Sequence, residues 1–145
     1  MRSFVWLRIA AGLTLVFAAL HTRGFPWTPI KDIDAQAVAE AMQNVHFTVL
    51  GEVRSYADFY VGFGLCIGAF LCFSAVTMWQ MGTLAKRGVG GLAPMNAGVT
   101  LLYLAQAVVA FKYIFAPPLL LSLLIVLCLG VAMVCERRQA APSEE

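Results

Sequence analysis

Residues 119–135 read LLLSLLIVLCLGVAMVC, an apolar run without a charged side chain. A helix needs about 20 mainly apolar residues to cross the hydrocarbon part of a bilayer, where no water can bond to its backbone. The run therefore predicts a transmembrane helix over about 118–135. Three further apolar stretches predict spans over about 4–22, 57–82 and 96–115. We expect an all-α membrane protein, a four-transmembrane-helix bundle in a single domain, 1–145, with a tail at 136–145.

Composition supports lipid as the solvent of this chain. Of its 145 residues, 61% are hydrophobic and 12% are charged, whereas soluble domains are roughly 45–50% apolar and about 25% charged. The net charge of +2 does not provide the basic surface of a nucleic-acid-binding protein, so we expect no nucleic-acid partner. All four cysteines lie in apolar runs and form no C-x-x-C pair, which predicts small buried hydrophobes.

The first apolar run has a second interpretation. Met1 and Arg2 followed by a short apolar stretch also resemble a secretory signal peptide. No A-x-A-like cleavage site follows that stretch, and residues 21–23 (His-Thr-Arg) are a poor cleavage region. We therefore expect a retained span, in which the long stem of Arg8 reaches back toward the interface.

The distribution of basic residues predicts the orientation. One side carries Arg2, Arg8, Lys86, Arg87, Arg137 and Arg138, and the opposite side carries fewer basic residues mixed with carboxylates. Because basic residues are enriched in cytoplasmic loops, we expect both termini in the cytoplasm. The segment between the first two spans then lies outside. The expected location is the bacterial inner membrane.

The external segment has a helical pattern. Val38, Met42, Val45 and Val49 recur at helical spacing, and Asp32 or Asp34 can cap the start by accepting backbone N–H bonds. This predicts an amphipathic helix over about 34–50. It serves either as an anchor on the membrane surface without a ligand, or as a lid over the mouth of the bundle.

Small and polar residues predict how the spans pack. Helices in lipid approach each other through small side chains and interhelical hydrogen bonds. The second span offers a stripe of small residues, Ala57, Gly64, Gly68 and Ala75. The side chains expected to bond between helices are Asn96, Tyr103, Gln106 and Gln80.

Polar side chains gather where the predicted spans meet the external leaflet, which is where a functional site is expected. The candidate ligand-binding residues are His21, His46, Arg54, Asp58, Tyr60 and Lys112. Several also have local explanations. Arg54 and Asp58 are spaced for a helical ion pair, Lys112 can extend to the interface, and His21 can bond to helix-end carbonyls.

Two functions fit this cluster. The first is a non-enzymatic bundle that binds a lipid-like ligand, or a partner membrane protein or second copy, at its external mouth. The second is a membrane enzyme acting on a lipid or quinone, with His21, His46 or Asp58 as acid or base and Arg54 or Lys112 orienting an anionic group. The sequence leaves open whether the protein is an enzyme.

A haem held between His21 and His46 is a third, weaker interpretation, because the two histidines are not both on predicted spans. No H-x-x-x-H or H-E-x-x-H spacing is present, so we expect no metal site. We also expect no cofactor.

Several short motifs resemble a group of uncharacterised small bacterial four-span inner-membrane proteins, and the resemblance covers most of the chain. It implies a fold and a location but no activity or catalytic residue. The size and span count also resemble DoxX-like proteins, without a residue-by-residue match. The motifs are His21-Thr22-x-Gly24, Asp58-Phe59-Tyr60-x-Gly62-Phe63-Gly64, Trp79-Gln80 and Phe111-x-Tyr113-x-Phe115-x-Pro117.

Overall fold

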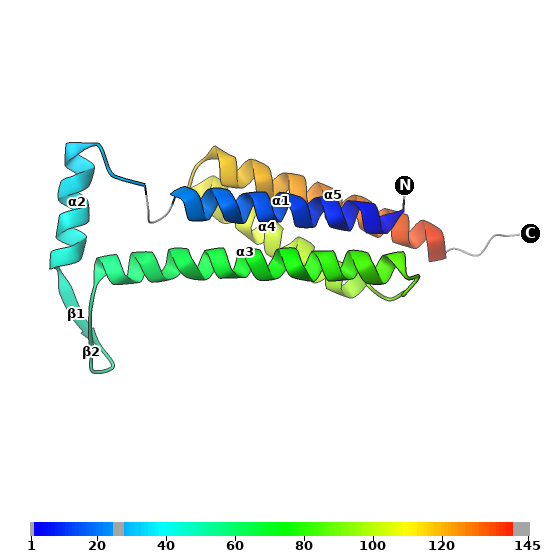
Figure 1. Ribbon diagram of the computed structural model, residues 1–145, viewed down its shortest axis with the longest axis horizontal. Helices are drawn as coiled ribbons and strands as arrows, with labels where there is room; N and C mark the ends of the chain where they lie inside the picture. Colours follow the sequence, from blue (N-terminus) through cyan, green and yellow to red (C-terminus); the bar gives the residue numbers. More distant parts are fainter. Residues whose placement is uncertain (1, 25–27, 141–145) are drawn as a thin grey trace, which may run out of the picture. The chain divides into compact units, whose positions relative to one another are not determined.

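The computed structural model describes residues 2–24 and 28–140 (Figure 1). The described chain is mostly helical and divides into two compact units. Unit 1 comprises Met1–Phe17 and Leu71–Glu145, and unit 2 comprises Ala18–Phe70. The elements are α1 (Ser3–Gly24), α2 (Ile33–Asn44), β1 (His46–Val49), β2 (Glu52–Ser55), α3 (Tyr56–Lys86), α4 (Ala93–Tyr113) and α5 (Ala116–Ala140).

Four helices, α1, α3, α4 and α5, are long and apolar enough to cross a membrane, which confirms the prediction of four helices of this kind. Their surfaces are apolar on the outside as well. In α3, only 17% of an 18-residue apolar stretch is buried. The side chains of Phe63, Phe70 and Phe73 are all exposed. Contiguous apolar surface on this scale is rare in soluble proteins and supports a multi-pass membrane protein. The predicted tail begins inside α5, and residues 141–145 lie outside the described residues.

The core of unit 1 receives side chains from all four of these helices. Thr14 of α1, Met78 of α3, Tyr103 of α4 and Leu129 of α5 are all fully buried. The Tyr103 hydroxyl donates to Oγ1 of Thr14 at 3.2 Å.

An amide bond links two helices in the same core. Nδ2 of Asn96 in α4 donates to the carbonyl oxygen of Leu129 in α5 at 3.1 Å. The prediction of interhelical bonds is thus confirmed for Asn96 and Tyr103. Within the described chain, Gln80 and Gln106 make no such bond.

Glycine and proline residues determine where α3 ends and where α5 begins. After α3, Gly88 takes a left-handed conformation with φ 78°. Its N–H then donates to Ala85 O, and the N–H of Val89 donates to Leu84 O, both at 3.1 Å. This is the bond pattern of a Schellman cap. Helix α5 begins at Ala116, with Pro117 in its first turn, where a missing N–H costs nothing.

The helix predicted over 34–50 is shorter than expected. Asp32 does cap its start, accepting from the N–H of Ala35 at 2.9 Å, but the helix ends at Asn44. Residues 46–55 form an antiparallel hairpin instead, with Phe47 paired to Arg54. The β-branched and aromatic residues of this stretch favour strands, and Leu50 and Gly51 adopt the positive φ angles of a two-residue turn.

Small residues of α3 lie where the sequence predicts close packing. Gly64 and Ala75 are buried. At Gly68, an added Cβ would touch Oγ1 of Thr22 in α1 at 3.7 Å.

The prediction for the cysteines is only partly right. Cys128 is buried and Cys135 is intermediate, but Cys66 and Cys72 are exposed. Both exposed thiols lie on the outward apolar surface of α3, where a small apolar side chain is equally suited to lipid.

Candidate functional site

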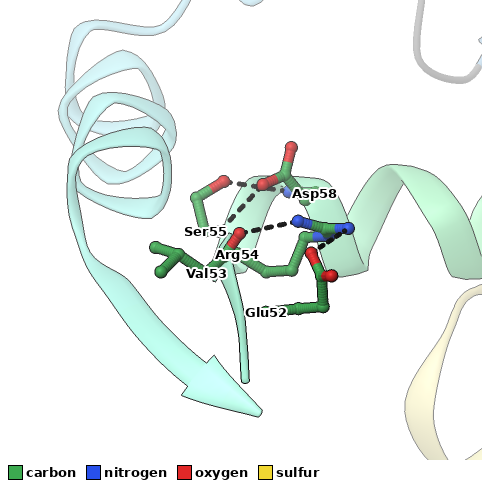
Figure 2. Close-up of polar contacts among 5 residues, drawn as sticks. All are labelled: Glu52, Val53, Arg54, Ser55 and Asp58. Atoms are coloured by element: carbon green, nitrogen blue, oxygen red, sulfur yellow. Dashed lines mark hydrogen bonds and ion pairs between the residues drawn. The ribbon is translucent and has the colours of Figure 1, made fainter. Parts of the chain in front are cut away.

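The start of α3 is organised by a reciprocal pair of hydrogen bonds (Figure 2). The N–H of Ser55 donates to Oδ2 of Asp58 at 2.8 Å, and the N–H of Asp58 donates to Oγ of Ser55 at 3.1 Å. This is the geometry of a capping box, which satisfies backbone donors that the first helical turn leaves unpaired. Asp58 therefore has a structural role at the start of α3.

Arg54 pairs with a different carboxylate from the one expected. Its guanidinium lies 3.1 Å from Glu52 and also donates to Val53 O at 2.8 Å, as Figure 2 shows. The predicted ion pair with Asp58 is not among the ion pairs of the described residues. Glu52 and Arg54 lie on the same face of β2, two residues apart, and both side chains are well exposed, so this pair adds little stability.

Arg54 and Asp58 do border the same shallow depression. Its volume is about 300 Å³, and Phe59, Gly62, Phe63 and Cys66 complete its lining. The ring of Phe59 lies 5.2 Å from that of Phe47 and 5.9 Å from that of Phe63, measured between centroids. The depression is therefore a mainly apolar surface that includes two aromatic rings and two charged residues.

His21 lies at the end of α1 and bonds across to α3. Its Nε2 is 2.8 Å from the carbonyl oxygen of Gly64. The expectation that His21 bonds to a helix carbonyl is confirmed, although that carbonyl belongs to another helix. A Cβ added at Gly68, one turn further along α3, would lie 3.9 Å from Cδ2 of this imidazole, an ordinary contact.

The two remaining candidates belong to different units, and His46 pairs across the hairpin with Ser55 of the capping box. Nδ1 of His46 is 3.0 Å from the carbonyl oxygen of Asn44, on an exposed surface of unit 2. Lys112 belongs to unit 1, where its Nζ lies 5.1 Å from the centroid of the Tyr113 ring.

Tyr60 borders a second and more enclosed hollow, which we call the α2 groove. Its volume is about 360 Å³. One wall comes from α2 and the other from the first turns of α3. The lining residues are Gly24, Thr28, Ile30, Ala35, Val38, Ala39, Met42, Gln43, Ala57, Tyr60 and Val61.

Of the six candidate residues, only Tyr60 lines the α2 groove. Sequence reasoning identified the apolar stripe of α2 but not the wall that faces it. The usable signal was Ala57 followed four residues later by Val61, which continues a small apolar face to the very start of α3.

Metal ligation finds no support in the described geometry. Across residues 2–24 and 28–140, no three His, Cys, Asp or Glu side chains come together in a way that would hold a metal ion. The side chains that line the α2 groove offer apolar contact and a few hydrogen bonds.

A comparison with protein-family models, with curated proteins and with solved structures found no match to this chain. The resemblance to small bacterial four-span proteins thus stays a hypothesis based on short motifs. The function has to be inferred from the α2 groove and the side chains around it.

Proposed function

We propose that this protein is a four-helix transmembrane bundle that binds a lipid-like ligand in the α2 groove, without transforming it. The observation that carries this proposal is the placement of α2. Its apolar stripe, which includes Val38 and Met42, faces Ala57, Tyr60 and Val61 of α3 across about 360 Å³ of open space. A hollow with apolar walls leaves room for an apolar guest.

The helix α2 is amphipathic, and the described residues of unit 2 leave its apolar side largely uncovered. None of its residues is buried, and Val38 is 61% exposed. Within unit 2, α2 runs across the direction of the first turns of α3 (Figure 1). If α3 crosses the membrane, a helix in this orientation lies along the membrane surface. Its apolar side then meets either lipid tails or a bound ligand.

The size and polarity of the α2 groove narrow the ligand class. Small-molecule sites have volumes of roughly 300–1,000 Å³, so about 360 Å³ fits one acyl chain segment or one ring. A whole two-chain phospholipid is too large. The polar lining side chains are Thr28, Gln43 and Tyr60, which are uncharged. They suit a hydroxyl or carbonyl group, as found in a single-chain lipid or a quinone.

A catalytic role is less well supported by the polar contacts. Asp58 is held in the capping box, and His21 bonds to the Gly64 carbonyl. The same His21 nitrogen, Nε2, is the usual contact atom for a haem iron. A membrane enzyme or a haem protein would require these groups to leave their present partners.

The charges support an orientation with α2 outside and both termini in the cytoplasm of a bacterial cell. Arg2 precedes α1, Lys86 ends α3, and Arg137 lies near the end of α5. These ends lie together in unit 1, because Leu92 N–H bonds to Glu136 at 3.1 Å and Gly82 packs on Phe4. The basic end is then the cytoplasmic one.

Filling the α2 groove should weaken ligand binding. Ala39 lines the groove and Ala37 does not, although both are in α2. We expect Ala39→Trp to weaken binding of a fluorescent single-chain fatty acid about tenfold or more, since each tenfold corresponds to roughly 1.4 kcal/mol of lost contact. The measurement is a titration of the purified protein in neutral detergent, followed by fluorescence of the fatty acid.

The matched control is Ala37→Trp, which adds the same ring on the opposite side of α2. This variant should bind the fatty acid like the unaltered protein. A folded Ala39→Trp protein with unchanged affinity would show that the α2 groove is not the ligand site.

A further inference from the structure

The guanidinium of Arg8 lies over two aromatic rings in unit 1, and we call this arrangement the Arg8 clamp. Its guanidinium carbon lies 4.8 Å from the centroid of the Trp79 ring in α3, and 5.8 Å from that of Phe4 in α1. Both distances are within the range of cation–π attraction. Trp79 is 52% exposed, so this clamp opens to the surroundings of the helices.

Close contact between α1 and α3 fixes the stem of Arg8. Gly82 is buried one turn beyond Trp79, and a Cβ added there would lie 3.2 Å from Cγ of Arg8. A Cβ at this position would be tightly packed, and the arginine stem would have to shift by a few tenths of an ångström. The arginine is thus held in place by packing as well as by the two rings.

Among the described residues of unit 1, no carboxylate pairs with the charge of Arg8. Its Nε is buried, and no acceptor lies within hydrogen-bonding distance in the described chain. Glu136 is the sole carboxylate of unit 1 between residues 2 and 140, and it accepts the N–H of Leu92. A buried donor without a partner is costly, and more so when it is charged.

The surroundings of Arg8 favour an anion. Arg2, Lys86 and Arg87 lie at the same end of unit 1 as Arg137 and Arg138. Arg8 is five residues inside the start of α1, and at about 1.5 Å per residue its Cα lies roughly 8 Å along the helix. An arginine stem can extend from this depth to the level of lipid phosphates.

We propose that Arg8, presented by Trp79 and Phe4, binds a phosphate group at this end of the helices. The depth of the residue and the exposed Trp79 ring assign that phosphate to an anionic membrane phospholipid. The planar guanidinium offers paired N–H donors that match phosphate oxygens. The site shares no residue with the α2 groove. The proposal for Arg8 therefore does not depend on ligand binding in that groove.

The test is a titration of the purified protein in neutral detergent with phosphatidylglycerol, followed by native mass spectrometry. We expect Arg8→Gln to weaken phosphatidylglycerol binding about tenfold, because the charged fork is lost. Arg87→Gln removes an exposed charge at the same end and should change the affinity by no more than about twofold, as expected for a peripheral charge. Equal losses in the two variants would reduce the effect to general surface charge and overturn the site.

Two further measurements test the same site, one with an Arg8→Lys variant and one with inorganic phosphate as a competitor. Arg8→Lys retains the charge but not the fork, so it should also bind phosphatidylglycerol more weakly. It replaces Arg8→Gln if that variant does not fold, and an unchanged affinity of Arg8→Lys would contradict the proposal. Inorganic phosphate alone should not displace the lipid. Equal competition by inorganic phosphate would contradict the assignment to a membrane phospholipid.

Discussion

Replacing Asn96 by aspartate is expected to destabilise the protein by roughly 3–5 kcal/mol, the cost of an uncompensated buried charge. Asn96 is 1% exposed, and its Nδ2 donates to the Leu129 carbonyl at 3.1 Å. A carboxylate at this position loses the donor and turns an oxygen toward that carbonyl. The measurement is the midpoint of thermal unfolding in neutral detergent.

Acidification provides an internal check on Asn96→Asp. A protonated carboxyl is neutral and can donate to the Leu129 carbonyl, so the destabilisation should shrink as the pH falls. Asn44→Asp makes the same chemical change at the exposed end of α2 and should leave the midpoint nearly unchanged. Equal effects of the two variants would mean that Asn96 is not buried between α4 and α5.

Replacing Gly82 by leucine is the second change with a large expected effect. An added Cβ would lie 3.2 Å from Cγ of Arg8 and 3.3 Å from the backbone oxygen of Phe4. The arginine stem can move aside, but at the Phe4 oxygen the backbone of α1 itself would have to shift. Overpacking of this kind costs about 1–3 kcal/mol or more, which should appear as a lower midpoint of unfolding.

Gly62→Leu is the matched control, because Gly62 is also in α3 and a Cβ there meets nothing within 4 Å. Surface substitutions of this kind stay within about 0.5 kcal/mol. A Gly82→Leu protein as stable as Gly62→Leu would contradict the close approach of α1 and α3 in unit 1.

The spans were predictable because each depends on local composition. An apolar run such as 119–135 is sufficient for a helix in lipid, and Gly88 and Pro117 mark where neighbouring helices end and begin. The cap at Asp32 is equally local. These features require no knowledge of distant residues.

The hairpin was missed because two patterns overlap in its sequence. Val45 and Val49 continue the helical spacing of Val38 and Met42 by coincidence. The stronger signals were the β-branched residues and the turn at Leu50 and Gly51. Identifying the hairpin also identifies Ser55 as the residue that caps α3.

The candidate site was only partly predictable, because it depends on which helices meet. From the sequence alone, Asp58 is a candidate catalytic acid. The structure shows instead that Asp58 and Ser55 are joined by two hydrogen bonds at the start of α3. Arg8 reads as a residue that extends to the interface, and the contacts with Trp79 and Gly82 come from a helix about seventy residues away. Contacts between distant segments of this kind leave no periodic signal in the sequence.

Alternating exposure of the loops is the most direct test of four membrane crossings. Single cysteines at Glu40, Gly90 and Phe115, in a chain whose native cysteines are replaced by alanine, would be treated with a membrane-impermeant maleimide in intact cells and in permeabilised cells. We predict that Glu40→Cys and Phe115→Cys are labelled in intact cells, and that Gly90→Cys is labelled only after permeabilisation. Labelling of all three positions from the same side would contradict the account.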